Sequence, residues 1–278
     1  MAYSLPLKRA ILLSYLVLSG SPLVLAHPGV SAALDYYDHQ IEKSLQNQAL
    51  YIQRGIIYSN DGQYQKAEAD FSRAAELGDP VVVSYDLGVL HYRKKEFDTA
   101  KRYFNAYLKR FPDHTKCLEY RARLLRDARD FDAALNDLRR VFALEQRPNP
   151  GLYFSAAQML QSSGGDGIQK ALNLIDEANL KLGLMPQLQR YAIDLEIQRN
   201  APIKAIERLQ TLKPMLGKSP EWKVEMGELL LNLGRNDEAK QYFREAAEQL
   251  DTLRPTPARQ HLLLKAESHL KTLAANPN

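Results

Sequence analysis

Residues 51–80 read YIQRGIIYSNDGQYQKAEADFSRAAELGDP, and this stretch decides the fold. Apolar residues recur at helical spacing on both sides of a short polar turn formed by Asn60, Asp61 and Gly62. The pattern therefore predicts two helices joined by a tight turn. Because each helix is apolar on more than one face, the pair is not stable alone and must stack against neighbouring pairs.

The same pattern repeats along the chain at a nearly constant period. Successive copies of one small residue lie 33, 34, 37, 34 and 34 residues apart, at Ala67, Ala100, Ala134, Ala171, Ala205 and Ala239. Four residues further on, each copy has a large apolar side chain: Phe71, Phe104, Leu138, Ile175, Leu209 and Phe243. Four copies have a second small residue twelve positions earlier: Gly55, Gly88, Ala122 and Gly227. Since small residues let two helices approach closely, the repetition predicts closely packed helix pairs.

This pattern resembles the tetratricopeptide repeat, a unit of 34 residues with Gly or Ala at position 8, Ala at 20, Phe at 24 and Pro at 32. With Gly55 as position 8, the resemblance covers six units, of which the third to fifth are more degenerate: 48–80, 81–114, 115–149, 150–185, 186–219 and 220–253. The resemblance implies an all-α fold, a right-handed superhelical solenoid of helix-turn-helix units. It also implies that the chain binds another protein or a peptide.

A solenoid needs a polar covering at each end. Residues 254–278 are predicted to form a capping helix and tail, with Leu262, Leu263, Ala266, Leu270 and Leu273 on one face. At the other end, residues 27–47 form an N-terminal segment in which a helix is expected over 32–46.

The first 26 residues have the features of a signal peptide. Lys8 and Arg9 precede an apolar run over 10–18, and the residues before Ala26 suit a signal peptidase, so cleavage is predicted after Ala26. A retained membrane anchor is the alternative, but residues 19–22 interrupt the run well short of the roughly 20 apolar residues a spanning helix needs. We therefore expect a periplasmic or secreted protein with no transmembrane segment after cleavage.

Charge and cysteine content exclude several classes of protein. Without Lys8 and Arg9 the predicted mature chain has 35 basic and 33 acidic residues, so its near-neutral charge does not favour nucleic acid as a partner. Cys117 is the single cysteine, which excludes an intramolecular disulfide and a cysteine metal cluster.

No residue pattern predicts catalysis or a cofactor, so the chain is interpreted as a binding protein and not an enzyme. Residues 164–167 are rich in glycine but lack the Lys and the Ser or Thr of a phosphate-binding loop, and they are interpreted as a turn between helices. The isolated histidines are interpreted as surface or capping residues, not metal ligands: His91, His114, His261 and His269.

Candidate partner-binding residues come from the resemblance, which implies a concave groove lined by positions 2, 5, 9, 12 and 13 of the first helices. In the second to fourth units these positions give Tyr85, Val89, Tyr92, Arg93, Lys116, Glu119, Arg123, Arg126, Asp127, Phe154, Gln158 and Gln161. Tyr and Arg are the residues that most often anchor interfaces. A solvated helical face is the alternative interpretation. The Lys-and-Asn clamp of some family members is absent, because Ile52 and Ile56 occupy its positions.

Three functional hypotheses follow. The first is an exported scaffold that binds a protein partner, in envelope assembly or export. The second is binding of an anionic cell-envelope polymer or lipid, because residues 93–140 contain 14 basic and 8 acidic residues, a net charge of +6. The third, a minor alternative, is copper binding at a new N-terminal His27, with His39 as the nearest second ligand.

The predicted register can be tested at its small residues. Replacing Ala100 or Ala239 with Leu is expected to destabilise the protein by about 1–3 kcal/mol, because overpacking a close helix contact forces the helices apart. Thermal melting of each variant measures the effect. Unchanged melting temperatures in both variants would show that the register is wrong.

Overall fold

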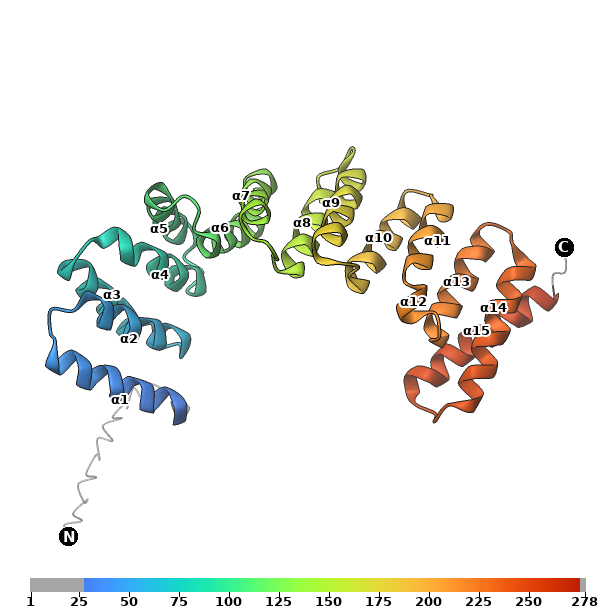
Figure 1. The fold of residues 1–278 in the computed structure, drawn as a ribbon, viewed down its shortest axis with the longest axis horizontal. Coiled ribbons are helices and arrows are strands. Elements are labelled where there is room, and N and C mark those ends of the chain that lie inside the picture. The colour runs from blue at the N-terminus through green and yellow to red at the C-terminus, as the bar shows by residue number, and fades with distance from the viewer. Residues whose placement is uncertain (1–27, 276–278) are drawn as a thin grey trace, which may run out of the picture. The chain divides into compact units, whose positions relative to one another are not determined.

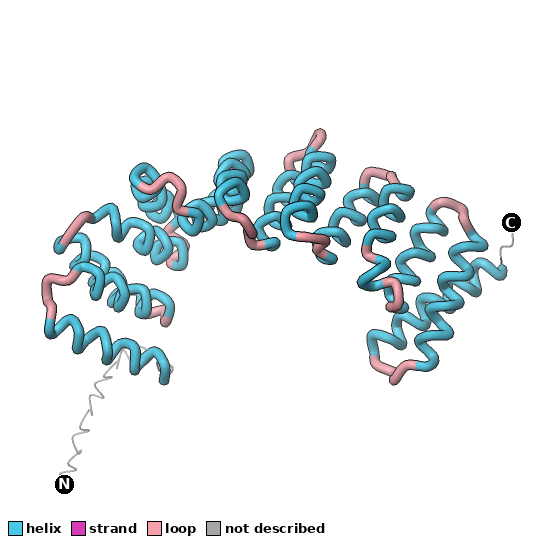
Figure 2. The backbone as a smooth tube through the Cα atoms, in the orientation of Figure 1, coloured by secondary structure: helices cyan, strands magenta, loops and turns pink. Residues whose placement is uncertain are grey.

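The computed structural model describes residues 28–275, and every regular element in that range is a helix (Figures 1 and 2). The all-α fold class is thus confirmed for this part of the chain. The signal peptide predicted over 1–26 lies outside the described residues. The chain divides into two compact units, one ending at Asp86 and one beginning at Leu87.

The helices follow one another in pairs. The first unit contains α1 (Pro28–Lys43), α2 (Gln48–Asn60), α3 (Tyr64–Leu77) and the first half of α4 (Pro80–Arg93). The second unit continues with α5 (Phe97–Arg110), α6 (Thr115–Asp127), α7 (Phe131–Leu144), α8 (Pro150–Ser162), α9 (Gly167–Leu182), α10 (Pro186–Gln198), α11 (Pro202–Thr211), α12 (Lys213–Leu216), α13 (Pro220–Asn232), α14 (Asn236–Thr252) and α15 (Pro257–Ala275). The helix expected over 32–46 begins four residues earlier, at Pro28, and ends at Lys43. The single turn α12 was not expected.

The pairs close on the predicted small residues. Ala100 and Ala239 are completely buried, and so are their counterparts in the other units. At Gly88, an added Cβ would lie 2.5 Å from the ring of Phe104, and at Gly227 it would lie 2.7 Å from the ring of Phe243. The aromatic side chain of the second helix therefore lies against the backbone of the first, which only glycine permits at this separation.

A recurrent turn joins the two helices of each pair. In five units its last residue donates a backbone hydrogen bond to the carbonyl five residues earlier, for example Glu96 to His91 at 2.9 Å and Arg235 to Leu230 at 3.0 Å. This bond is the signature of the Schellman motif, which ends a helix with a residue in the left-handed region. This residue stands at position 15 of the repeat, and it is in the left-handed region in all six repeats: Gly62, Lys95, Arg129, Gly164, Asn200 and Gly234.

Bidentate ion pairs connect the two helices in two of the units. Arg54 on α2 donates to both oxygens of Asp70 on α3, at 2.8 and 2.6 Å, and Arg121 on α6 does the same to Asp137 on α7, at 2.7 and 2.6 Å. Both aspartates are buried, so their charges are compensated by the fork of the arginine.

Helix α15 covers the last pair. Ala266 is completely buried, and Leu262, Leu270 and Leu273 pack against the core formed by α13 and α14. This is the capping face that the sequence predicts, except that Leu263 is not part of the packed set.

One histidine does not lie where the sequence placed it. His91 is buried and not a surface or capping residue, because its Nδ1 lies 2.5 Å from Glu96 Oε2 and its ring stacks on Tyr103 at 5.3 Å. His114, in contrast, caps α6 through a hydrogen bond from the Cys117 amide to its Nδ1. Cys117 itself is completely buried, and burial raises the pKa of its thiol to about 12.

The left-handed turn residues yield a stability prediction. Lys95 and Arg129 have φ angles of 62° and 61°, a conformation that costs a residue with a Cβ about 1–2 kcal/mol but costs glycine nothing sterically. Lys95→Gly and Arg129→Gly are each expected to stabilise the protein by about 0.5–1 kcal/mol, the steric gain less the greater entropy of glycine in the unfolded chain. The shift in the urea midpoint measures this. The control, Gly62→Ala, should destabilise the protein. Equal or lower midpoints for both glycine variants would show that Lys95 and Arg129 are not strained in the left-handed conformation.

Candidate partner-binding surface

The expected groove residues lie on the first helix of each pair. Among them, Tyr85 belongs to the first compact unit and the remainder to the second. Tyr85, Val89, Tyr92 and Arg93 are on α4, all partly exposed. Lys116, Glu119, Arg123, Arg126 and Asp127 are on α6, and Phe154, Gln158 and Gln161 are on α8.

One group of these residues comes together between α4 and α6. The Tyr92 hydroxyl donates to Asp127 Oδ2 at 2.8 Å, and the Tyr92 ring meets the Tyr120 ring edge-on at 6.1 Å. The Arg123 guanidinium lies over the Tyr120 ring, 5.2 Å from its centre. Burial, and then the bond to Asp127, raises the pKa of Tyr92. The Tyr92 ring is therefore held at a fixed position on the surface of the second compact unit.

Arg126 extends this group toward α8. It donates to Asp127 Oδ1 at 2.8 Å and to the Ser155 hydroxyl at 3.3 Å. Beside it lies a small cavity of about 230 Å³, whose lining includes Arg123, Arg126, Ser155 and Met159. Arg126 thus lines a small recess instead of projecting freely into solvent.

The other candidates divide into structural and exposed residues. Glu119 is buried, not a groove-lining residue, since it pairs with Lys116 at 2.8 Å and with Arg123 at 3.5 Å. The Phe154 ring packs on Tyr191 of α10 at 4.8 Å. Gln158 is exposed.

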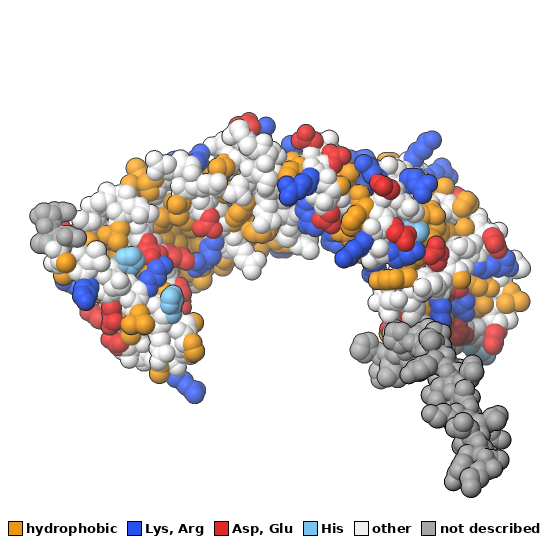
Figure 3. Space-filling model, turned by 180° about the vertical axis from the view of Figure 1, so that it is seen from behind, with side chains coloured by type: hydrophobic (Ala, Val, Ile, Leu, Met, Phe, Trp, Pro, Cys, Tyr) orange, Lys and Arg blue, Asp and Glu red, His pale blue; other side chains and the backbone are white. Residues whose placement is uncertain are grey.

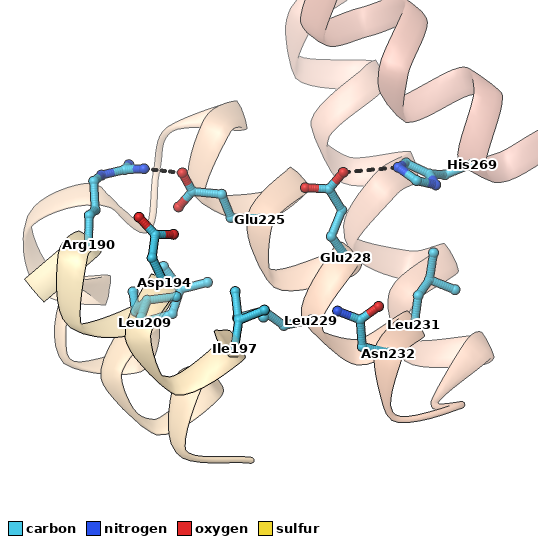
Figure 4. Close-up of a pocket in the computed structure, with 11 residues that line it drawn as sticks. Arg190, Asp194, Ile197, Leu209, Glu225, Glu228, Leu229, Leu231, Asn232 and His269 are labelled. Atoms are coloured by element: carbon cyan, nitrogen blue, oxygen red, sulfur yellow. Dashed lines mark hydrogen bonds and ion pairs between the residues drawn. The ribbon is translucent and has the colours of Figure 1, made fainter. Parts of the chain in front are cut away.

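A larger cavity, of about 530 Å³, lies toward the C-terminal end of the second compact unit, between α10, α13 and α15 (Figure 4). We call it the acidic pocket. Three carboxylates line it, together with one arginine, one histidine, an asparagine and a set of apolar side chains: Asp194, Glu225, Glu228, Arg190, His269, Asn232, Ile193, Ile197, Leu209, Leu229 and Leu231. Arg190 and Glu225 form an ion pair.

Charge in the acidic pocket is unevenly compensated. Glu228 is contacted by two groups of α15, Lys265 at 2.7 Å and His269 at 3.1 Å. Asp194 has no hydrogen-bond or ion-pair partner in the range 28–275, although Arg190 lies near enough to oppose the rise in its pKa. Burial raises the pKa of Asp194. Burial also raises the pKa of Glu225, and the negative charges of Glu228 and Asp194 raise it further. The pocket therefore carries three carboxylates, of which Asp194 is exposed and Glu225 and Glu228 are partly exposed.

The sequence contained a signal for this pocket that went unused. Arg190, Asp194 and Ile197 occupy positions 5, 9 and 12 of the fifth unit, and Glu228 and Leu231 occupy positions 9 and 12 of the sixth. Carrying the groove positions past the fourth unit would have named them. The contribution of α15 could not be found this way, because a capping helix has no position in the repeat.

The described residues offer little for metal chemistry or membrane insertion. Between residues 28 and 275, no group of three or more His, Cys, Asp or Glu side chains is placed to hold a metal ion. His27 lies outside the described residues, and His39 is 3.6 Å from Glu42 on the exposed side of α1. Over the same range, none of the helices combines the length and the apolar character needed to cross a bilayer.

The fold is that of a helical-repeat protein, of the kind that serves as a scaffold for protein–protein interaction. Residues 52–115 and 85–148 match one tetratricopeptide repeat model, and residues 223–249 match a second. The chain belongs to the tetratricopeptide repeat family.

Solved structures show the same superhelical repeat fold. A tetratricopeptide repeat protein from Parabacteroides merdae is 15% identical, with a TM-score of 0.50 over 86% of this chain and 92% of its own. YrrB, described as a tetratricopeptide repeat protein with an unusual peptide-binding site, is 18% identical, with a TM-score of 0.53 over 67% of this chain and 95% of its own. The Naa15/Naa10 complex bound to HypK has a chain that is 17% identical, with a TM-score of 0.52 over 90% of this chain and 40% of its own.

Among curated proteins, this chain is similar to the mitochondrial import receptor subunit TOM70 of Saccharomyces cerevisiae. The identity is 24% over 153 residues, which are 52% of this chain and 25% of the yeast protein. The chain thus spans about a quarter of the length of that relative.

Proposed function

We propose that this protein is an exported scaffold that binds a partner protein along the first helices of its repeats and acts in envelope assembly or export. The observation that carries the proposal is the acidic pocket, in which groove positions of two successive units line one open cavity of about 530 Å³. Ligand sites are commonly concave, largely apolar and about 300–1,000 Å³ in volume. The cluster of Tyr92, Tyr120, Arg123 and Arg126 supplies a second contact region, because tyrosine and arginine are the residue types that anchor interfaces.

Export is supported by the sequence of the leader. A short basic region, an apolar run and a suitable cleavage position occur together within 26 residues. The single, buried Cys117 is compatible with an oxidising compartment, because the chain has no second thiol with which it could form a disulfide.

The export proposal predicts a mature N-terminus at His27. Protein purified from the periplasm or the medium of a bacterial host should begin there, as N-terminal sequencing or intact-mass measurement would reveal. Leu13→Arg, which places a charge in the apolar run, should leave full-length protein inside the cell. A wild-type protein that keeps residues 1–26 and stays in the cytoplasm would contradict export.

A second candidate function is binding of an anionic envelope polymer through α5. Lys101, Arg102, Lys109 and Arg110 are exposed there, and none has a carboxylate partner between residues 28 and 275. Elsewhere in the basic region, arginines such as Arg121 and Arg140 are paired with aspartates. On the face drawn in Figure 3, Lys and Arg side chains alternate with Asp and Glu instead of forming one patch. The exposed side of α5 is therefore the part of this region best suited to an anion.

The two candidate functions predict different outcomes for paired substitutions. Tyr92→Ala with Arg126→Ala is expected to reduce capture of the wild type's partners from envelope extract at least about thirtyfold, since truncating such anchors commonly costs 2 kcal/mol or more. Circular dichroism should show unchanged helix content.

The matched control is Lys101→Ala with Arg102→Ala, which removes exposed side chains of α5. It is expected to leave protein capture unchanged. If the control pair abolishes capture and the groove pair does not, binding occurs through α5 or through general charge, and the anionic-polymer function takes precedence.

A further inference from the structure

Asp194 is the unusual group in the acidic pocket. Its carboxylate points into the space between Arg190 and Glu225 (Figure 4), and it lacks the ion-pair partner that each of the other two carboxylates has. Asp194 is exposed, so a cation of a ligand can reach it, and an opposite charge at close range stabilises the charged form of a carboxylate.

The apolar side chains next to Asp194 indicate which kind of cation fits the pocket. Ile197, one helical turn further along α10, is 44% exposed, and Leu229 of α13 lies across the pocket from it. A hydrated metal ion would gain nothing from these side chains, and the carboxylates are not placed to hold one among residues 28–275. Lys and Arg side chains combine an aliphatic stem, which packs on apolar surface, with a charged head.

We infer that the acidic pocket binds a Lys or Arg side chain, flanked by an apolar residue, in a peptide segment of the partner protein. The cationic head lies at Asp194, and the stem lies along Ile197 and Leu229. The inference rests on the proposed function, because it names the partner chemistry for one part of the same groove. His269 of α15 lines the pocket beside Glu228, and its Nε2 lies 3.1 Å from Glu228 Oε1.

The test begins with a random dodecapeptide library displayed on phage and selected against the purified wild-type chain. Enriched peptides are expected to share a Lys or Arg next to an apolar residue. The best of them is then synthesised with a fluorescent label, both as selected and with norleucine in place of the cation. Fluorescence anisotropy gives the dissociation constants with wild type, Asp194→Asn and Glu248→Gln. Glu248 is an exposed carboxylate of α14 outside the pocket, so its variant is the charge-matched control.

Asp194→Asn is expected to weaken the cationic peptide about tenfold or more, the range for a hydrogen bond to a charged group. Glu248→Gln should leave affinity unchanged. Norleucine should weaken binding to the wild type and have little further effect on binding to Asp194→Asn. In a double-mutant cycle, the effects of two changes on the binding free energy are not additive when the two groups interact. Asp194→Lys should reverse the preference, so that a peptide with Glu at the cationic position binds better than the original.

Other results overturn the inference in distinguishable ways. Enriched peptides that bind Asp194→Asn as tightly as wild type would leave the groove function standing and remove the role of the pocket. If no peptide is enriched, the inference fails, and the Tyr92 and Arg126 experiment still decides the groove function. A second copy of the chain in the pocket would appear in light scattering as a concentration-dependent mass that Asp194→Asn lowers, which also excludes a partner peptide.

Discussion

The close contact between a small residue on the first helix of a pair and a large apolar side chain on the second, an aromatic ring in three of the six repeats, is the constraint on which the structure depends. Gly88 against Phe104, and Gly227 against Phe243, leave no room for even one methyl group. The contact sets the separation of the two helices of a pair, and that separation fixes which side chains of the first helix remain on the surface. The groove positions are thus a consequence of packing on the opposite side of the same helix.

The sequence predicted this packing well because it depends on local spacing. The all-α class and the buried alanines follow from residues at a fixed period, and the apolar face of α15 follows from helical spacing within that segment. His91 was misplaced because its partner Glu96 lies beyond the turn, where the Schellman geometry brings it back to 2.5 Å. The acidic pocket was missed because the groove positions were assigned only in the second to fourth repeats, and because α15 is outside the repeat.

Charge along the first helices of unit two changes sign. At position 9 of the repeat α6 carries Arg123, whereas α10 and α13 carry Asp194 and Glu228. If the first helices bind a partner as proposed, a partner with charge of both signs would be favoured in one direction along them and opposed in the other. Electrostatic complementarity of this kind gives orientation and specificity more than affinity.

Helix α15 is both a wall of the pocket and the last helix of the array. Lys265 and His269 reach from this helix to Glu228, and their contacts are made only while α15 is docked. Binding in the pocket and docking of α15 would consequently be linked equilibria. A bound segment would slow amide hydrogen exchange in α15, and release of α15 would also release the segment.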